Sequence, residues 1–197
     1  MKNILRKWQE RKSSASTGNS KKTNTKQGLN EIFTAYYEEN YWGSNESVSG
    51  RGSENVQTIH VQKILNSVIN EFNIKSILDI PCGDFNWIKN TDIKKINYIG
   101  ADIVEGIIRN NSERFSDNNL SFECLNIVKD RLPTVDLIFV RDCLVHLSYE
   151  NVLEALVNIK NSGSKYLLTT SFIGRDNNHD IKDGDWRPLN LEIDPIN

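Results

Sequence analysis

Two carboxylates and a glycine turn occupy positions at which a nucleoside could bind. Asp79 ends one apolar run, and Asp102 ends the next one, 23 residues later. A tight turn around Pro81 and Gly83 follows Asp79, and glycine allows backbone conformations and close approaches that other residues do not. A carboxylate at the end of the second run can accept hydrogen bonds from both hydroxyls of a ribose. The spacing indicates a nucleoside site, with the alternative that Asp102 only caps the helix after it.

A second group of candidate residues follows the apolar run 135–140. Asp142 and His146 are four residues apart, so both side chains project to one side of a helical turn. A histidine titrates near neutrality, and a carboxylate can accept a proton from a hydroxyl, so either residue is a candidate general base. The alternative is that His146 packs under the next helix and Asp142 caps it.

The polar segment 171–190 contains residues that could bind an acceptor molecule. Arg175, Trp186 and Arg187 are the candidates, because a tryptophan face stacks on a sugar ring and a guanidinium group binds anionic oxygens. An ordinary surface loop anchored by one tryptophan is the alternative.

These residues need a scaffold, and the pattern of the chain predicts one. Short β-branched runs alternate with segments of helical spacing, which is typical of a parallel sheet with helices on both faces. We therefore predict an α/β fold, a Rossmann-like three-layer sandwich with a mostly parallel sheet. Its ligand would lie at the carboxyl ends of the strands. The expected strands are 76–80, 97–102, 120–124, 135–140 and 165–170, and the main expected helices are 56–72, 103–115 and 149–161, with a short helix after Asn30.

Composition and charge narrow the class of protein further. The 197 residues carry a formal net charge of -2, which gives no global reason to expect a nucleic acid as partner. No apolar run approaches the length of a membrane helix. The three cysteines are widely spaced and show no metal-ligand pattern, so we expect reduced thiols in a cytoplasmic protein and no metal site.

The amino-terminal residues differ in composition from the rest. Residues 1–26 contain eight basic residues and one acid, and the stretch 13–30 is poor in apolar residues. We expect a basic flexible arm at 1–29 and one domain at 30–197. The arm is either an electrostatic contact for an acidic surface or lipid headgroups, or a solubilising tail.

Over approximately residues 42–197 the sequence resembles the class I S-adenosylmethionine-dependent methyltransferases. The resemblance rests on an apolar strand, an acid and a glycine turn, here Leu78-Asp79-Ile80-Pro81-Cys82-Gly83-Asp84-Phe85. Pro81 and Phe85 stand where the first and third glycines of that motif usually lie. A dinucleotide needs those glycines for its pyrophosphate, so their absence counts against NAD or FAD. The Pro-Cys-Gly-Asp-Phe-x-Trp version resembles a bacterial subgroup associated with surface-polysaccharide modification.

The resemblance implies S-adenosyl-L-methionine as cofactor and assigns roles to individual positions. Asp102 would hold the ribose, Asn126 would contact adenine, and Arg51, in a lid at 46–53, would lie near the methionine carboxylate. The segment with Asp142 and His146 would face the acceptor. Residues of the first motif would line the methionine end of the cofactor; they are Asp79, Pro81, Gly83, Asp84 and Trp87.

The function expected from these features is O-methyl transfer to a carbohydrate or a phosphorylated small molecule. The main alternative is a non-catalytic nucleoside-binding or scaffold module on the same fold, and a nicotinamide-dependent oxidoreductase is disfavoured by the missing glycines. The resembled enzymes add a sixth and a seventh strand, for which residues 170–197 leave no room. We therefore expect either a truncated chain or a partner, such as a second copy in a homodimer, over the exposed sheet edge.

Overall fold

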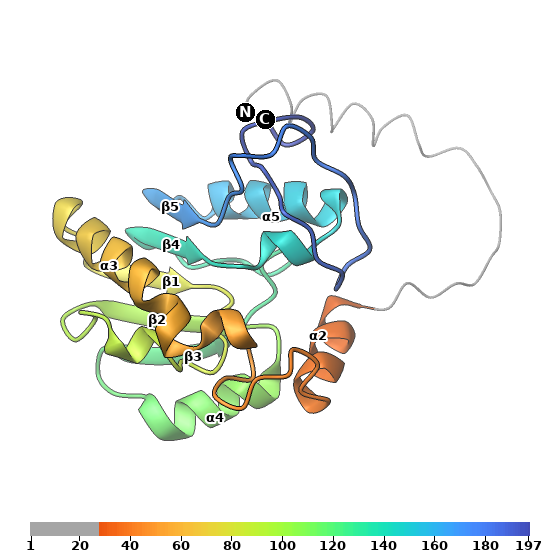
Figure 1. The fold of residues 1–197 in the computed structure, drawn as a ribbon. Coiled ribbons are helices and arrows are strands. Elements are labelled where there is room, and N and C mark those ends of the chain that lie inside the picture. Colours follow the sequence, from red (N-terminus) through yellow and green to blue (C-terminus); the bar gives the residue numbers. More distant parts are fainter. Residues whose placement is uncertain (1–27) are drawn as a thin grey trace.

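The computed structural model describes residues 28–197. Five strands form one parallel sheet in the order β3-β2-β1-β4-β5, which confirms the predicted fold class (Figure 1). The basic arm expected at 1–29 falls almost entirely outside the described residues, so its role stays a prediction. The strands are β1 (Ser76–Asp79), β2 (Asn97–Asp102), β3 (Leu120–Cys124), β4 (Leu137–Val140) and β5 (Tyr166–Thr169).

Helices cover both faces of this sheet (Figure 1). The connection from β1 to β2 contains only a short 3-10 turn, η2 (Ile88–Asn90), and the connection from β3 to β4 contains no helix. Longer helices connect β2 to β3 and β4 to β5. The helices are α2 (Leu29–Glu38), α3 (Asn55–Glu71), α4 (Glu105–Phe115) and α5 (Tyr149–Asn161), with two further 3-10 turns at η1 (Arg51–Ser53) and η3 (Leu144–His146). None of the helices within residues 28–197 is both long and apolar enough to span a bilayer.

The two-residue period of the central strands divides the core into two clusters. Leu78 of β1 and Ile138 of β4 belong to the cluster that includes α5. Their neighbours Ile77 and Leu137 belong to the cluster that includes α3. Because successive side chains of a strand point to opposite faces, both faces of the sheet are buried. Strands β1 and β4 are held on both sides, so the positions where they end are rigidly defined.

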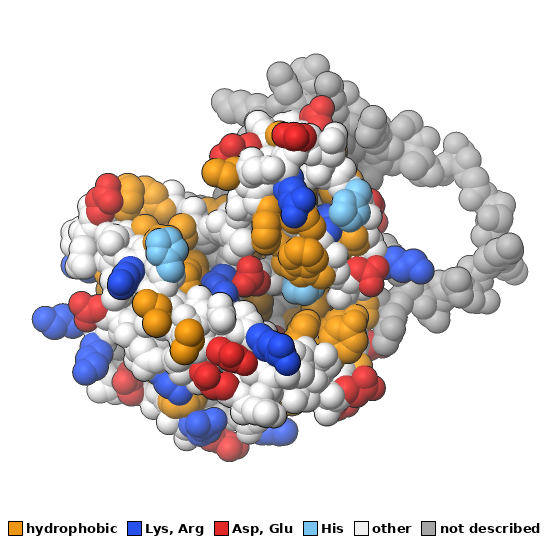
Figure 2. Space-filling view, in the orientation of Figure 1, with side chains coloured by type: hydrophobic (Ala, Val, Ile, Leu, Met, Phe, Trp, Pro, Cys, Tyr) orange, Lys and Arg blue, Asp and Glu red, His pale blue; other side chains and the backbone are white. Residues whose placement is uncertain are grey.

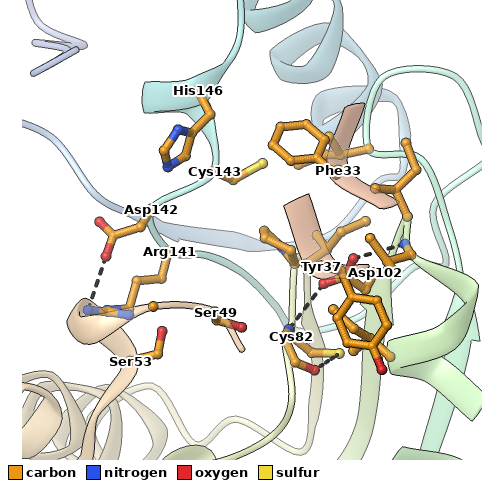
Figure 3. A pocket seen from close by; sticks show the side chains of 18 of the residues that line it. Phe33, Tyr37, Ser49, Ser53, Cys82, Asp102, Arg141, Asp142, Cys143 and His146 are labelled. Atoms are coloured by element: carbon orange, nitrogen blue, oxygen red, sulfur yellow. Dashed lines mark hydrogen bonds and ion pairs between the residues drawn. The ribbon is translucent and has the colours of Figure 1, made fainter. Parts of the chain in front are cut away.

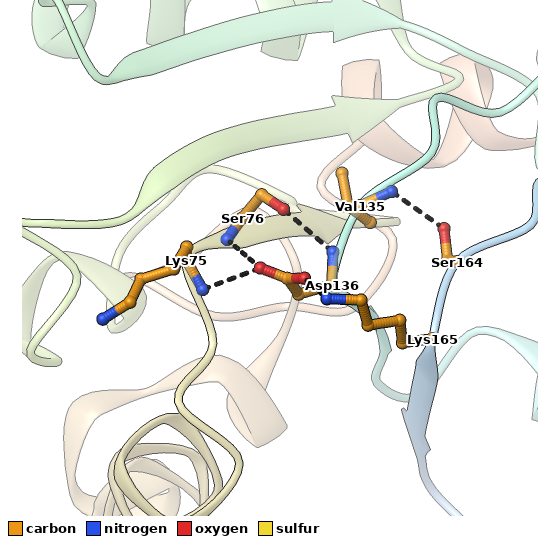
Figure 4. Close-up of polar contacts among 6 residues, drawn as sticks. All are labelled: Lys75, Ser76, Val135, Asp136, Ser164 and Lys165. Carbon is orange, nitrogen blue, oxygen red and sulfur yellow. Dashed lines mark hydrogen bonds and ion pairs between the residues drawn. The ribbon is translucent and has the colours of Figure 1, made fainter.

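Asp136 holds strands together at the amino-terminal edge of the sheet, opposite to the carboxyl ends where the ligand is expected (Figure 4). One oxygen of Asp136 accepts backbone hydrogen bonds from Lys75 at 2.9 Å and Ser76 at 3.2 Å. Its other oxygen lies 2.7 Å from Nζ of Lys165. The hydrogen bond from Lys165 is the main reason why the pKa of Asp136 lies below its usual range. This group joins the starts of β1, β4 and β5 far from their carboxyl ends.

The segment after β5 forms no helix or strand in the described structure and folds back over η3 (dark blue in Figure 1). Phe172 donates a backbone hydrogen bond to Leu189 at 2.9 Å, and Gly184 donates one to His146 at 2.8 Å. The segment therefore returns to the edge of the sheet where the ligand is expected.

Candidate functional site

A cavity of about 380 Å³ lies at the carboxyl ends of β1, β2, β3 and β4. This is the edge predicted from the strand pattern. The space-filling view is hollowed near its centre, where hydrophobic side chains gather beside acidic and basic ones (Figure 2). The close-up shows that residues from α2, from the turn before α3 and from η3 surround the same space (Figure 3).

Asp79 is the carboxylate at the end of β1, and it lines the cavity while being only 3% exposed. The phenol hydroxyl of Tyr98, on the adjacent strand β2, donates a hydrogen bond to it. Burial raises the pKa of Asp79 to about 7, although the Tyr98 hydrogen bond and the charge of Arg141 act in the opposite direction. No described cation lies within ion-pair distance of this carboxylate.

Asp102 ends β2 and faces the same cavity. Its Oδ2 accepts the backbone N–H of Gly83 at 3.2 Å, and its Oδ1 accepts that of Val104 at 3.0 Å. Burial raises the pKa of Asp102 to about 6, while the backbone hydrogen bonds lower it. Helix α4 has Val104, not Asp102, at its N-cap position. Each carboxylate oxygen keeps a further acceptor site, so Asp102 can still accept hydrogen bonds from a ligand.

The turn after β1 is covered by the segment before α3. Gly83 adopts φ +55°, and a Cβ added there would lie 2.1 Å from Oγ of Ser49. Asp84 holds this segment in place, because its two oxygens accept hydrogen bonds from Ser47 Oγ at 2.9 Å and from the N–H of Val48 at 3.0 Å. Asp84 was expected to contact the cofactor, but it does not line the cavity and instead anchors the covering segment.

Arg141, which follows β4, links three parts of the site. Its Nη2 donates to the carbonyl of Gly52 at 2.8 Å and lies 3.0 Å from Oδ2 of Asp142. Its guanidinium lies 5.5 Å from the ring centre of Trp87, which also lines the cavity. No pattern in the sequence singled out Arg141, although it lies beside Asp142. The ion pair occupies one oxygen of Asp142, which leaves that candidate base less free than His146.

His146 ends η3 and lines the cavity together with Asp142, so the structure brings the two candidate bases to one site (Figure 3). Its Nδ1 is 3.0 Å from the carbonyl oxygen of Asp185. A carbonyl can only accept, so Nδ1 carries the hydrogen and Nε2 has a free lone pair. Burial lowers the pKa of His146, which keeps the ring neutral at pH 7. The rings of Phe33 and Trp42 are centred 6.5 and 6.0 Å away.

The three residues expected to bind the acceptor occupy different places. Trp186 lines the cavity, is 57% exposed and packs edge-on against Phe172. Arg175 is exposed and does not line the cavity. Arg187 is fully buried outside the cavity lining, with its guanidinium 5.2 Å from the ring centre of Tyr149. In this position it cannot contact an acceptor in the cavity, which corrects the sequence-based expectation.

The remaining predicted residues line the cavity. Pro81 lies in the turn after β1, and Arg51 lies in η1 at the exposed side. Asn126 follows β3, where its side-chain oxygen accepts the N–H of Val128 at 2.9 Å and its own backbone N–H donates to Asp130. The amide nitrogen of the Asn126 side chain has no hydrogen-bond partner among residues 28–197, so it could donate to an adenine.

Residues of α2 form a wall that sequence reasoning missed. The apolar positions after Asn30 predicted a helix, but nothing in them indicated that it would cover the site. The wall consists of Leu29, Phe33 and Tyr37 from α2, with Trp42 after it. Cys82 and Cys143 also line the cavity, and burial raises the pKa of both thiols, so neither is a ready nucleophile. Within residues 28–197 there is no cluster of side chains suited to a metal ion.

Two solved methyltransferases share this arrangement of strands. The N-methyltransferase NodS from Bradyrhizobium japonicum WM9, in complex with S-adenosyl-L-homocysteine, superposes with a TM-score of 0.53 and 15% identity, covering 64% of this chain and 67% of that one. Magnesium protoporphyrin IX methyltransferase from Synechocystis PCC 6803, with S-adenosylmethionine bound, gives a TM-score of 0.50 and 14% identity over 71% of this chain and 74% of that one. These likenesses show the class I methyltransferase fold. No protein-family model and no curated protein matches the sequence.

Proposed function

We propose that this chain is an S-adenosylmethionine-dependent methyltransferase whose cofactor binds in the cavity at the carboxyl ends of the strands. In this proposal the ribose lies at Asp102 and the methionine end lies near Asp79 and Gly83. Pro81, Trp87, Asn126 and Arg51 complete the cofactor side; Asp84 contributes by anchoring the segment that covers the turn.

One observation carries this proposal. Asp79 and Asp102 are both buried, both line the cavity, and neither has a described cation at ion-pair distance. Buried carboxylates are costly to ionise unless a positive group or hydrogen-bond donors compensate them. A ligand with a positive centre and two ribose hydroxyls supplies what these two carboxylates lack. A dinucleotide phosphate would bring further negative charge close to both.

His146 and Asp142, which line the same cavity, fit methyl transfer to a hydroxyl. When bound, S-adenosylmethionine supplies a methyl group on a positively charged sulfur. The task of the protein is then to hold the acceptor oxygen in line with that methyl group, which supplies much of the rate acceleration. His146 is the base in this proposal, because Nε2 of its neutral ring can take the hydroxyl proton. Asp142 is held by Arg141 and supports the charge that develops on His146.

The acceptor in this proposal is a carbohydrate or a phosphorylated small molecule. The aromatic faces of Trp42 and Trp186, both in the cavity lining, support a sugar ring. Surface-polysaccharide modification, a cytoplasmic location and a homodimer belong to the same proposal.

Calorimetric titration with S-adenosylhomocysteine tests the cofactor assignment. We expect binding by the full chain, no binding of NADH, and at least tenfold weaker S-adenosylhomocysteine binding by Asp102→Asn. The matched control is Asp136→Asn, because Asp136 also accepts two backbone N–H groups but lies at the opposite edge of the sheet. Equal affinity in the wild type and Asp102→Asn would remove the ribose assignment. Binding without methyl transfer to any sugar or sugar phosphate would favour the nucleoside-binding module.

A further inference from the structure

The segment that ends in Arg187 holds η3 by its backbone. Gly184 donates its N–H to the carbonyl of His146 at 2.8 Å, and Arg187 donates its N–H to the carbonyl of Val145 at 3.1 Å. Between these two contacts, the carbonyl of Asp185 accepts the hydrogen on Nδ1 of His146 at 3.0 Å. Three residues of this segment therefore set both the place of η3 and the tautomer of its histidine.

The side chain of Arg187 adds to the same contacts. Its Nη1 donates to the carbonyls of Leu144 at 3.3 Å and Val145 at 3.1 Å. These are successive residues of η3, directly before His146. The carbonyl of Leu144 also accepts the N–H of Leu147 at 3.3 Å within the turn, and that of Val145 also accepts the N–H of Arg187. Each carbonyl oxygen has two lone pairs, and a guanidinium group can bind two carbonyls at once.

Burial of the positively charged side chain of Arg187 costs free energy. The residue is fully buried, and its Nε and Nη2 have no hydrogen-bond partner among the described residues. The ring of Tyr149, the two carbonyls and the negative charges of Asp180 and Asp183 compensate it in part. A buried charge of this kind is weak support for stability, because an apolar side chain of similar size would pack there at lower cost. The contacts of Arg187 with η3 give a reason other than stability for an arginine at this position.

We propose that Arg187 is a positioning residue that fixes η3, and with it the Nδ1–H tautomer of His146, so that Nε2 is the basic nitrogen of the site. The inference deepens the proposed function and rests on it for the use of that nitrogen. In the reaction, the acceptor oxygen forms its bond to the methyl carbon as the carbon–sulfur bond breaks and leaves its electron pair on sulfur. The hydroxyl proton passes to Nε2 of His146 and afterwards to water.

The charged groups that face His146 act in opposite directions on it. Asp142 raises the pKa of His146, and the positive charge of Arg187 lowers it. A neutral ring with a defined tautomer is what a base needs before it accepts a proton. Arg187 therefore acts on His146 in two ways, by fixing the position of η3 and by lowering the pKa of the ring, and it does not touch the acceptor.

Nitrogen NMR of the full chain labelled with ¹⁵N-histidine tests the positioning directly. The chain has three histidines, so the signals of His146 are assigned by their loss in His146→Gln. We expect the wild type to show the Nδ1–H tautomer at pH 7.5. Arg187→Met should show a mixture of tautomers and a higher His146 pKa, while Arg187→Lys keeps the charge and should preserve most of the wild-type pattern. Lys182→Met, an exposed cation in the same segment, is the control and should change nothing.

Kinetics supply the second readout. With saturating cofactor, Arg187→Met should reduce kcat at least tenfold and shift the acidic limb of the pH profile upward, with the affinity for S-adenosylhomocysteine unchanged. If Arg187→Met does not fold, the positioning role is tested by the tautomer of His146 in the wild type and in Arg187→Lys. An Nε2–H tautomer in the wild type, or a wild-type spectrum in Arg187→Met, would overturn the positioning role. If the tautomer behaves as expected but S-adenosylhomocysteine does not bind, the proposed function fails and the positioning role stands.

Discussion

Tyr98 of β2 donates its phenol hydrogen to Asp79 of the neighbouring strand β1, and both side chains are buried. The tyrosine cannot neutralise the carboxylate, because its hydrogen bond supplies a dipole and not a charge. Burial and the nearby Asp79 raise the pKa of Tyr98 well above its usual range, so it remains a donor at any physiological pH. Asp79 is thus held in a fixed place, and no cation of the described residues forms an ion pair with it.

Asp79→Asn should stabilise the protein at alkaline pH and weaken cofactor binding. The pKa of Asp79 is raised from 3.8 to about 7 in the folded protein, so the folded state holds this proton more tightly than the unfolded chain does. Its unfolding free energy therefore falls as pH rises from about 4 to about 7. The full shift corresponds to about 4 kcal/mol, as an upper limit. Urea unfolding should show a larger gain in the variant at pH 8 than at pH 5, since asparagine still accepts from Tyr98. An equal gain at both pH values, or a less stable variant at pH 8, would contradict this.

The affinity for S-adenosylhomocysteine should fall as pH is lowered from 8 to 5. Asp79 and Asp102 have pKa values of about 7 and about 6, so both lose their charge across this range. The ammonium group of the ligand favours the ionised carboxylates, and each protonation that opposes binding costs up to about tenfold per pH unit. Titrations at several pH values should show a steeper fall in the wild type than in Asp79→Asn. Affinity independent of pH would place the ligand away from these carboxylates.

Gly83→Ala should weaken S-adenosylhomocysteine binding and lower the melting temperature. The new methyl group would lie 2.1 Å from Oγ and 3.2 Å from Cβ of Ser49, at a φ of +55°. A left-handed conformation costs a non-glycine residue about 1 kcal/mol before any clash is counted. Adding Ser49→Gly removes the clash but not the backbone cost, so it should restore part of the loss. Gly174→Ala is the control, because nothing lies within 4 Å of its added methyl group; equal effects of the two alanines would refute the close approach.

Arg141→Gln should loosen the segment that covers the cavity. The substitution removes the hydrogen bond to the carbonyl of Gly52 and the ion pair with Asp142. Hydrogen bonds that involve a charged group contribute about 1.5 to 3 kcal/mol. We expect five- to tenfold weaker S-adenosylhomocysteine binding and faster amide hydrogen exchange at residues 44–53. Asp142→Asn leaves the Gly52 contact in place and should leave exchange in this segment as in the wild type.

Removal of residues 1–26 should leave the affinity for S-adenosylhomocysteine within about twofold of the full chain. The described residues that line the cavity begin at Leu29, and the anchors of the covering segment lie between Ser44 and Asp84. Calorimetry on the shortened protein measures this directly. A loss of more than tenfold would assign the basic residues a part in the site.

The strand ends were predictable from the sequence because local pattern determines them. The apolar runs that end at Asp79 and Asp102 have the length and composition of buried strands, and parallel strands bring their carboxyl ends to one edge. Those two positions and the turn at Gly83 therefore meet in the structure as the pattern indicated. Asp142 and His146 were predictable for the same reason, because they come soon after the end of β4.

The residues that were missed or misplaced depend on contacts between distant parts of the chain. Arg187 stands in a polar stretch that looks exposed, and only the carbonyls of η3, about 40 residues earlier, explain its burial. Asp84 lies in the cofactor motif, yet Ser47 and Val48, from a separate segment, determine what it does. No local pattern indicates which of several polar loops will fold over which turn. Helix α2 covers the site for the same reason.

Phe33 and Asp185 both reach His146, one from each end of the described chain. A chain still emerging from the ribosome can form β1 to β4 and the carboxylates long before Gly184 to Arg187 leave the exit tunnel. During that interval the proposed adenosyl site already has its two carboxylates, while His146 lacks its contact with Asp185. In the proposed enzyme, the contacts that support the base therefore form after those of the cofactor site, and a chain halted before Gly184 would lack the hydrogen bond from Nδ1 of His146 to Asp185.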